Sequence, residues 1–483
     1  MTQRSNLPSK PMSQSPETNS RWEATAQRVR LLTGNWRPDL EQELLRHFDS
    51  ARRAAIGIAD MSSNVFKAIC EALSALYAEA PAIGVTGDTG RSAAPLLDKG
   101  GFLDKAGWFS LMQTVQIFTI GCREMVIRVG VNPHQQGLLF RPITPDYIYA
   151  TAPGDDPENP NYLYELILRQ NKETKKFEWT ADVFDLRGDI PKFYIMTVGQ
   201  DGEFLENVTR QYTGSEDLSG ENYPYIDRNG EAFIPYVIYH ARNSGNLWMP
   251  YELAEVCRGS LSTSALYTYY LHLLRDVAHP QRYLAGFQLA GLSAYDTDSS
   301  GARQAISTDP ASILCFSADP DSSAQGMIGQ FASGGDPMTF LEAICTYERR
   351  LAVYAGVSPA DIVKASGDPR SGFAISLQHS QKRQYQRQFS PVFRFGDIRT
   401  LELAAKIANS AFGLSMPESG YIVEYSSVPL SPEALKAQRE DILSKINAGL
   451  MSKVDAIQVL YPDFTRQEAI NYLLQIENDQ KQF

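Results

Sequence analysis

The spacing of apolar residues changes several times along this chain. Over residues 60–80 they recur at steps of three and four, and Pro81 follows, which predicts an amphipathic helix. A second helix is predicted over residues 104–122. Beyond it, short Tyr- and Phe-rich pieces alternate with Asp, Pro, Gly and Asn turns, a pattern typical of strands. The predicted strands cover residues 124–128, 138–140, 147–150, 162–168, 177–184 and 193–198. The first half is therefore expected to be a β-containing domain with helices beside it.

Long helices dominate the middle of the chain. A buried-strand pattern over residues 234–239 precedes a helix that opens at Pro250 and continues to about Ala278, on the order of 40 Å of rise. Asp336 followed by Pro337 predicts the start of a second long helix. Its expected apolar face consists of Leu341, Ile344, Tyr347, Leu351 and Tyr354. Residues 283–335, rich in Ser, Asp, Ala and Gly with one predicted strand over 312–317, form a small module between the two helices.

A polar loop follows the second long helix. Residues 358–372 hold too many Gly, Pro and Ser breakers for regular structure. A helix resumes at about Phe373 and runs past Pro391. The missing N–H of Pro391 and the clash of its ring predict a kink that breaks the helix there. A strand over residues 421–428 and helices after Pro432, Ser452 and Thr465 complete the chain. Residues 1–20, poor in apolar side chains, are expected to be a disordered arm.

The charge of the kinked helix opposes that of the whole chain. The protein carries 45 basic and 56 acidic residues, a net charge of −11. This balance argues against a protein that wraps nucleic acid non-specifically, because phosphate neutralisation supplies most of that affinity. The kinked helix nevertheless has six basic and two acidic residues, so any DNA contact is expected to be local and weak. Its cations are Lys382, Arg383, Arg387, Arg394, Arg399 and Lys406.

The cysteines and the hydropathy of the chain indicate the compartment in which the protein is expected to occur. The five cysteines are scattered and contain no Cys-x-x-Cys pair, so they are expected to be core residues in a reducing compartment, with no metal site. No secretory leader and no apolar stretch of bilayer length is visible. We expect a soluble protein that is made in the cytoplasm and has no membrane partner.

Enzyme motifs are weak. Residues 84–92 resemble a phosphate-binding loop, but the outer glycines are one residue too far apart and Arg91 stands where lysine is required. His272 and His279 lie seven residues apart, two helical turns, too far to share one metal ion. Neither a Gly-x-Ser-x-Gly elbow nor a His-Glu-x-x-His pair occurs. The prediction is a protein without catalytic activity and without a cofactor; a nucleotide-binding enzyme built on residues 84–92 is the alternative.

Three segments, in this order, resemble the portal proteins of tailed double-stranded DNA bacteriophages. The first is Ile-Pro-Tyr-Val-Ile at residues 234–238, followed by a turn and a long helix. The second is LAVYAGVSPADIVKASGDPRS at 351–371, a helix that ends in a Val-Ser-Pro turn. The third is AGLMSKVDAIQVLYPDFTRQEA at 448–469. The resemblance spans roughly residues 55–478.

The resemblance implies an α+β portal fold with a mixed α/β wing, long stem helices, a small α/β clip, a bent tunnel helix and a short helical crown. The implied parts are an arm over 1–20, the wing over 21–248, stem helices over 249–278 and 336–357, the clip over 279–335, the tunnel loop over 358–372, a kinked helix and return strand over 373–428, and the crown over 429–483.

The same resemblance implies a structural protein rather than an enzyme. Its family forms a dodecameric ring at one capsid vertex of the virion, a channel for packaging and ejecting the genome. Partners implied are the large terminase subunit, a head-tail adaptor, the major capsid protein, a scaffolding protein and the double-stranded DNA that passes through. Assembly would take place in the host cytoplasm. Another ring component of the phage neck is the closest alternative.

Two sets of residues are candidates for DNA or subunit contacts. In the tunnel loop, Lys364 and Arg370 with Ser366 and Ser371 are candidates for transient phosphate contacts, against the alternative of solvated loop residues. On the kinked helix the cations Lys382, Arg383, Arg387 and Arg394 face either a neighbouring subunit, the channel or solvent. A few cations in a neutral or acidic lining would let DNA slide without tight binding.

Overall fold

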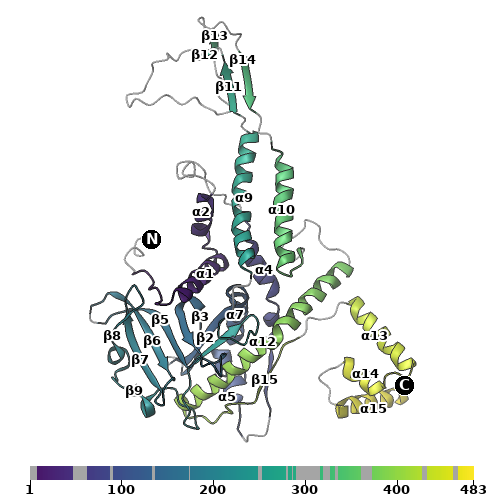
Figure 1. Ribbon diagram of the computed structural model, residues 1–483. Coiled ribbons are helices and arrows are strands. Elements are labelled where there is room, and N and C mark those ends of the chain that lie inside the picture. The colour runs from purple at the N-terminus through teal and green to yellow at the C-terminus, as the bar shows by residue number, and fades with distance from the viewer. Residues whose placement is uncertain are drawn as a thin grey trace.

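The computed structural model confirms an α+β fold (Figure 1). It describes residues 8–46, 63–86, 91–132, 136–172, 174–248, 253–278, 281–285, 287–289, 316–318, 327–331, 335–359, 372–426, 432–460 and 466–482.

The N-terminal part contains more helix than the sequence predicts. Asn64 caps the predicted helix by accepting from the backbone N–H of Lys67, and Gly107, at φ 62°, divides the second predicted helix in two. The helices are α1 (Pro16–Thr33), α2 (Arg37–Leu45), α4 (Val65–Leu73), η2 (Leu76–Ala78), α5 (Ala94–Leu97), α6 (Phe102–Lys105) and α7 (Trp108–Cys122). Their apolar faces share the largest core with the long helices described below.

Residues 8–20 are not the disordered arm that their composition predicts. The Ser15 side chain caps α1, which begins at Pro16. Upstream of it, the Lys10 ammonium lies 2.9 Å from a carboxylate oxygen of Asp146 and 4.3 Å from the centroid of the Tyr147 ring. These distant partners, which composition does not reveal, hold the segment against the large sheet.

Two antiparallel sheets form the β-containing domain, and all six strands predicted between residues 124 and 198 are confirmed. The smaller sheet has the order β10-β2-β3, and the larger β4-β5-β6-β7-β8 with β9 beside β7. The strands are β2 (Glu124–Asn132), β3 (Gly137–Ile143), β4 (Ile148–Thr151), β5 (Tyr162–Gln170), β6 (Phe177–Asp185), β7 (Lys192–Val198), β8 (Phe204–Asn207), β9 (Leu218–Ser219) and β10 (Tyr236–His240). Short helices η3 (Pro145–Tyr147), α8 (Thr209–Thr213) and η4 (Gly220–Asn222) connect them.

Two long helices project from this body side by side (Figure 1). They are α9 (Ala254–Ala278) and α10 (Pro337–Tyr354), close to their predicted bounds. Two small antiparallel ladders lie at the far end of the pair. They comprise β11 (Gln281–Ala285) with β14 (Met327–Phe331), and β12 (Phe287–Leu289) with β13 (Phe316–Ala318). The sequence predicts only one of these strands, over residues 312–317, and of that range 312–315 lie outside the described residues.

Helix α12 (Gly372–Phe412) crosses the body and packs on β10 and β2. It runs through Pro391 without interruption, so the break in the helix expected there is wrong, while the angle of any bend stays a prediction. Pro391 and Arg387, one turn earlier, are both exposed, so water can solvate the carbonyl group that lacks an N–H partner. The sequence pattern does not show this exposure.

The chain returns to the body before its last helices. Strand β15 (Tyr421–Glu424) pairs with β1 (Ala82–Val85), more than 330 residues earlier. The C-terminal helices α13 (Pro432–Asn447), α14 (Lys453–Leu460) and α15 (Arg466–Gln482) stand apart from the body in Figure 1. The helix predicted after Ser452 is α14, and the Ser452 hydroxyl caps its start by accepting from the Asp455 N–H at 3.1 Å. Among the described residues, no helix is long and apolar enough to cross a membrane.

Candidate functional site

The projecting helix pair is fixed to the body at one end. At its base, the Phe66 N–H of α4 donates to the Ser260 hydroxyl of α9 at 3.2 Å. A Cβ atom on Gly259 would lie 2.4 Å from Leu351 Cδ2, so glycine is what allows α10 to approach α9 this closely. At the other end of α10, the Asp336 carboxylate accepts from two backbone N–H groups and confirms the predicted N-cap. The glycine contact thus sets how closely the two helices pack, and the cap sets where α10 begins.

Apolar side chains remain exposed on both helices of the pair. On α9 they are Leu271, Leu274 and Val277, 39%, 37% and 44% exposed at steps of three residues. On α10, Met338, Val353 and Tyr354 are each 63% exposed. The three α9 side chains form a row, whereas on α10 Met338 lies at the far end of the helix and Val353 and Tyr354 lie at the body end. Exposed apolar side chains on such a helix pair are typical of an interaction surface. We call these two sets the α9 flank and the α10 flank.

The predicted apolar face of α10 is divided between the core and solvent. Ile344 and Leu351 are buried against the rest of the chain, as periodicity predicts, whereas Tyr347 and Tyr354 are exposed. The sequence pattern thus identifies the apolar residues but not which of them the single chain leaves uncovered. An apolar helix face that the single chain leaves partly exposed is suited to be covered by a neighbouring subunit.

The cations of α12 fall into three groups. Lys406 pairs with Asp227 at 3.1 Å, and the Arg399 guanidinium lies 3.9 Å from the centroid of the Phe395 ring, so these two have partners within the chain. Arg383 is half-buried, while Arg387 and Arg394 are exposed. The side chain of Lys382 lies outside the described residues. Arg387 and Arg394 therefore remain the candidates for contacts beyond this subunit.

The predicted DNA-contacting residues Lys364, Ser366, Arg370 and Ser371 lie outside the described residues. Their roles stay predictions. The described edge of the segment is tied to α12, since the backbone N–H of Ser358 donates to the Tyr385 hydroxyl at 3.3 Å. The segment between α10 and α12 therefore starts from a point fixed on α12.

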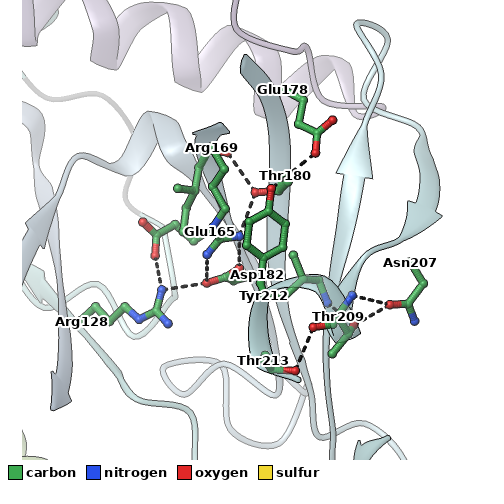
Figure 2. Close-up of polar contacts among 12 residues, drawn as sticks. Arg128, Glu165, Arg169, Glu178, Thr180, Asp182, Asn207, Thr209, Tyr212 and Thr213 are labelled. Carbon is green, nitrogen blue, oxygen red and sulfur yellow. Dashed lines mark hydrogen bonds and ion pairs between the residues drawn. The ribbon is translucent and has the colours of Figure 1, made fainter. Parts of the chain in front are cut away.

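A buried ionic cluster joins the two sheets (Figure 2). Asp182 on β6 accepts two hydrogen bonds from Arg169, at 2.7 and 2.9 Å, and one from Arg128 on β2 at 2.9 Å. Arg128 also bonds Glu165 at 3.0 Å, and Glu165 accepts from Arg141 and from the Tyr236 hydroxyl. Burial by itself would raise the pKa of Asp182, but the two arginines outweigh it and lower that pKa. The cluster fixes how the sheets meet.

Sequence reasoning missed this cluster. Asp182, Glu165 and Arg128 lie on predicted strands, and Arg169 and Arg141 lie one residue beyond them. Charged residues in strands normally face solvent. The available signals were two acidic residues inside apolar and aromatic stretches, Glu165 in β5 and Asp182 in β6. The partner Arg169 of Asp182 comes from the neighbouring strand β5 and its partner Arg128 from the other sheet. Local periodicity carries no information about either pairing.

The segment that resembles a phosphate loop lacks the expected surroundings. Gly84 lies in β1 and pairs with Ile422 of β15, and the helix that follows, α5, has only four residues. Ser92 accepts from the backbone N–H of Ala94 at 3.2 Å and thus caps a turn. Residues 87–90 are not among the described residues. The described part offers a turn between short elements instead of the long helix N-terminus that binds phosphate.

Metal and thiol chemistry find no support in the part of the chain that the structure describes. It contains no group of three or more His, Cys, Asp and Glu side chains placed to hold a metal ion. Cys70, Cys122, Cys257 and Cys345 are free thiols there. Burial raises the pKa of the first three, which makes them unreactive core residues.

Comparisons with known proteins give structural neighbours only. No family model and no curated protein matches this chain. Three solved chains cover 82% of it and 88% of their own length. One is from the virion of a native gene transfer agent particle, with 13% identity and a TM-score of 0.37. The others are from the necks of an empty and a native gene transfer agent particle, both 14% identical, with TM-scores of 0.38 and 0.36. At these TM-scores the likeness carries no argument about function.

Proposed function

We propose that this chain is a non-enzymatic, portal-type structural protein that forms a ring-shaped channel for double-stranded DNA at one capsid vertex. The observation that carries the proposal is the helix pair, which projects from the body, bears the small strand module at its far end and leaves an apolar flank on each helix. The three sequence segments that resemble portal proteins support it independently. They fall at the entry to the first projecting helix, at the end of the second, and in the C-terminal helices.

Two different flanks suit a ring better than a two-fold dimer. If the α9 flank of one copy meets the α10 flank of the next, the contact is heterologous, and such contacts close into a ring when the rotation permits. The proposed assembly is a dodecamer. The helices α9 and α10 would then line or surround the central channel.

The charges of the two helices suit passage of DNA rather than its retention. Helix α9 has two acidic and two basic residues, and so has α10. A lining without net positive charge releases few counterions and binds DNA weakly. We assign the transient phosphate contacts to Lys364 and Arg370, and contacts with a neighbouring subunit or the channel to Arg387 and Arg394.

The proposed partners follow the parts of the fold. The strand module between α9 and α10 would be the clip that docks the large terminase subunit during packaging and a head-tail adaptor afterwards. The sheet-containing body would face the major capsid protein and a scaffolding protein. In this proposal the chain is a virion component that is assembled in the host cytoplasm and supports genome packaging and ejection.

Imaging of the purified full chain tests the proposal most directly. We expect rings with a central opening in electron micrographs and one dominant large oligomer in native mass spectrometry, without ATP turnover by the protein alone. A stable monomer at micromolar concentration would overturn the proposal. A ring found elsewhere in the particle neck, or with another symmetry, would instead favour the alternative neck component.

The nucleotide-binding alternative has its own test. Titration with ATP should give no saturable binding to the full chain. Binding that disappears in Arg91→Ala would favour the alternative over the channel protein.

The predicted DNA contacts of the loop are tested separately from ring formation. Replacing both Lys364 and Arg370 with alanine should leave rings intact but change the amount of DNA packaged or retained, because phosphate contacts are lost. The matched control removes two exposed arginines elsewhere, Arg210 and Arg466. DNA content equal to that of wild-type particles would assign Lys364 and Arg370 to the solvated alternative.

A further inference from the structure

One carboxyl group of α12 lies where four separate elements meet. Asp397 is completely buried. The Tyr77 hydroxyl of η2 lies 2.8 Å from both of its carboxylate oxygens. The Tyr239 hydroxyl of β10 lies 3.0 Å from Oδ1, and that of Tyr425, just after β15, 2.7 Å from Oδ2. A single carboxyl group thus connects α12 to three elements of the body.

The neighbouring residues of α12 are shaped for this contact. A Cβ atom on Gly396 would lie 2.7 Å from the Tyr239 ring, so only glycine lets the ring approach the helix. The Thr400 hydroxyl lies 2.7 Å from the Tyr239 hydroxyl, one turn further along. Gly396, Asp397 and Thr400 therefore form the surface of α12 against which Tyr239 packs.

No cation hydrogen-bonds to this carboxyl group among the described residues. The titratable groups that face it are the three phenols. Arg394, an exposed residue one turn earlier, acts on the pKa of Tyr425 in the lowering direction. Aromatic side chains close the site: the Tyr77 ring has its centroid 6.1 Å from that of Phe393 and 6.3 Å from that of Trp108. A carboxylate in such surroundings is costly, since the group is completely buried and, among the described residues, no cation hydrogen-bonds to it.

The protonation state of Asp397 decides how the hydrogen bonds run. As a carboxylate it accepts from all three phenols. As a carboxylic acid it donates one hydrogen bond, and one phenol oxygen must accept. Burial raises the pKa of Asp397 to about 7, although the three phenol hydrogen bonds act in the opposite direction. Burial, with the charge of Asp397 adding to it, also raises the pKa of Tyr77 and of Tyr239, so both phenols stay neutral.

We propose that Asp397 is a proton-sensitive latch that sets how firmly α12 is seated on the body. With the neutral acid, α12 is held by hydrogen bonds at no charge cost. With the carboxylate, the same contacts enclose an uncompensated charge, and α12 is held less firmly. Helix α12 also anchors Ser358, at the edge of the segment that follows α10. A change in how α12 packs on the body would therefore be transmitted through Tyr385 to Ser358. The latch does not depend on the proposed ring.

The sign of the pH effect follows from the direction of the shift. The pKa is raised from its ordinary value of 3.8, so the folded chain binds the proton more tightly than the unfolded chain. The stabilising contribution is complete below pH 3.8 and is lost as the pH rises through about 7. Between the two values, the unfolding equilibrium constant changes about tenfold per pH unit.

The experiment compares the full-length wild type with Asp397→Asn. Denaturant unfolding is measured between about pH 4.5 and 6.5, and hydrogen exchange of α12 and β10 amides, corrected for intrinsic rates, between pH 5.5 and 8. The wild-type unfolding constant should rise about tenfold per pH unit relative to that of Asp397→Asn. The protection of α12 should fall with pH in the wild type only. Parallel profiles of the two proteins would overturn the proposal.

A second variant keeps the test decisive if Asp397→Asn does not fold. Tyr425→Phe retains the carboxyl group but removes one hydrogen-bond donor to its charged form. This change should raise the pKa of Asp397 further and extend the pH dependence to higher pH. A Tyr425→Phe profile identical to that of the wild type would likewise overturn the latch, because a purely structural Asp397 would give no such displacement.

Discussion

Replacing Asp182 with alanine is expected to lower the free energy of unfolding by about 3–5 kcal/mol. Asp182 is buried and accepts hydrogen bonds from Arg169 and Arg128, which come from different sheets. Its removal leaves two largely buried guanidinium groups without their shared anion. Glu165 and Thr180 remain as partners and limit the loss. Unfolding of the wild type and of Asp182→Ala in guanidinium chloride at pH 7 measures this loss of stability.

The same strand provides a matched control. Asp185 also binds an arginine through both oxygens, but Arg187 is half exposed. Asp185→Ala should therefore cost only about 0–1 kcal/mol. Equal losses for the two variants would contradict the idea that burial makes the Asp182 cluster important.

The contribution of the Asp182 cluster to stability should also depend on pH in the acid range. Because the arginines lower the pKa of Asp182 below 3.8, its stabilising contribution is present above that value. It is lost as the pH falls through the lowered pKa. The stability difference between wild type and Asp182→Ala should thus shrink in strong acid.

Much of the secondary structure follows from local sequence patterns. The β5 to β7 strands alternate or form apolar runs between clear turns, and the start of α10 is marked by Asp336 and Pro337. These signals act over a few residues, where propensity, capping and turn chemistry decide the outcome. Helix α12 also begins where its pattern resumes. Its continuity through Pro391 depends on solvent exposure, which the pattern does not contain.

The rest depends on pairs that are distant in the chain. Strand β1 owes its pairing to β15, Lys10 is held by Asp146, and Asp397 by Tyr77. Nothing in the spacing of residues near any of these positions identifies its partner. The α9 and α10 flanks are a further case, since periodicity shows that Tyr354 is on the apolar side but not that the chain leaves it uncovered. The order of the main helices and strands could be predicted from the sequence, and the long-range contacts could not.

Disrupting the α10 flank with Val353→Asp should convert rings into monomers or small oligomers. Val353 is 63% exposed in the single chain, so a charge there should change the stability of the subunit by no more than about 0.5 kcal/mol. In the proposed ring the same side chain, at the body end of α10, would be enclosed by the neighbouring subunit. An unpaired carboxylate enclosed among apolar side chains costs several kcal/mol. Every subunit contact carries the substitution once, so the effect acts on each interface of the ring.

Leu205→Asp is the control for this prediction. Leu205 lies on β8, is 62% exposed and has no part in the helix pair. Mass photometry of the two variants at equal concentration should show rings for Leu205→Asp and their loss for Val353→Asp. Val277→Asp on the opposing flank should reproduce the loss, because a heterologous contact fails from either side. Intact rings in both flank variants would place the subunit interface elsewhere on the molecule, even if the wild type forms rings. Loss of rings in Leu205→Asp alone would direct attention to the β8 edge of the large sheet.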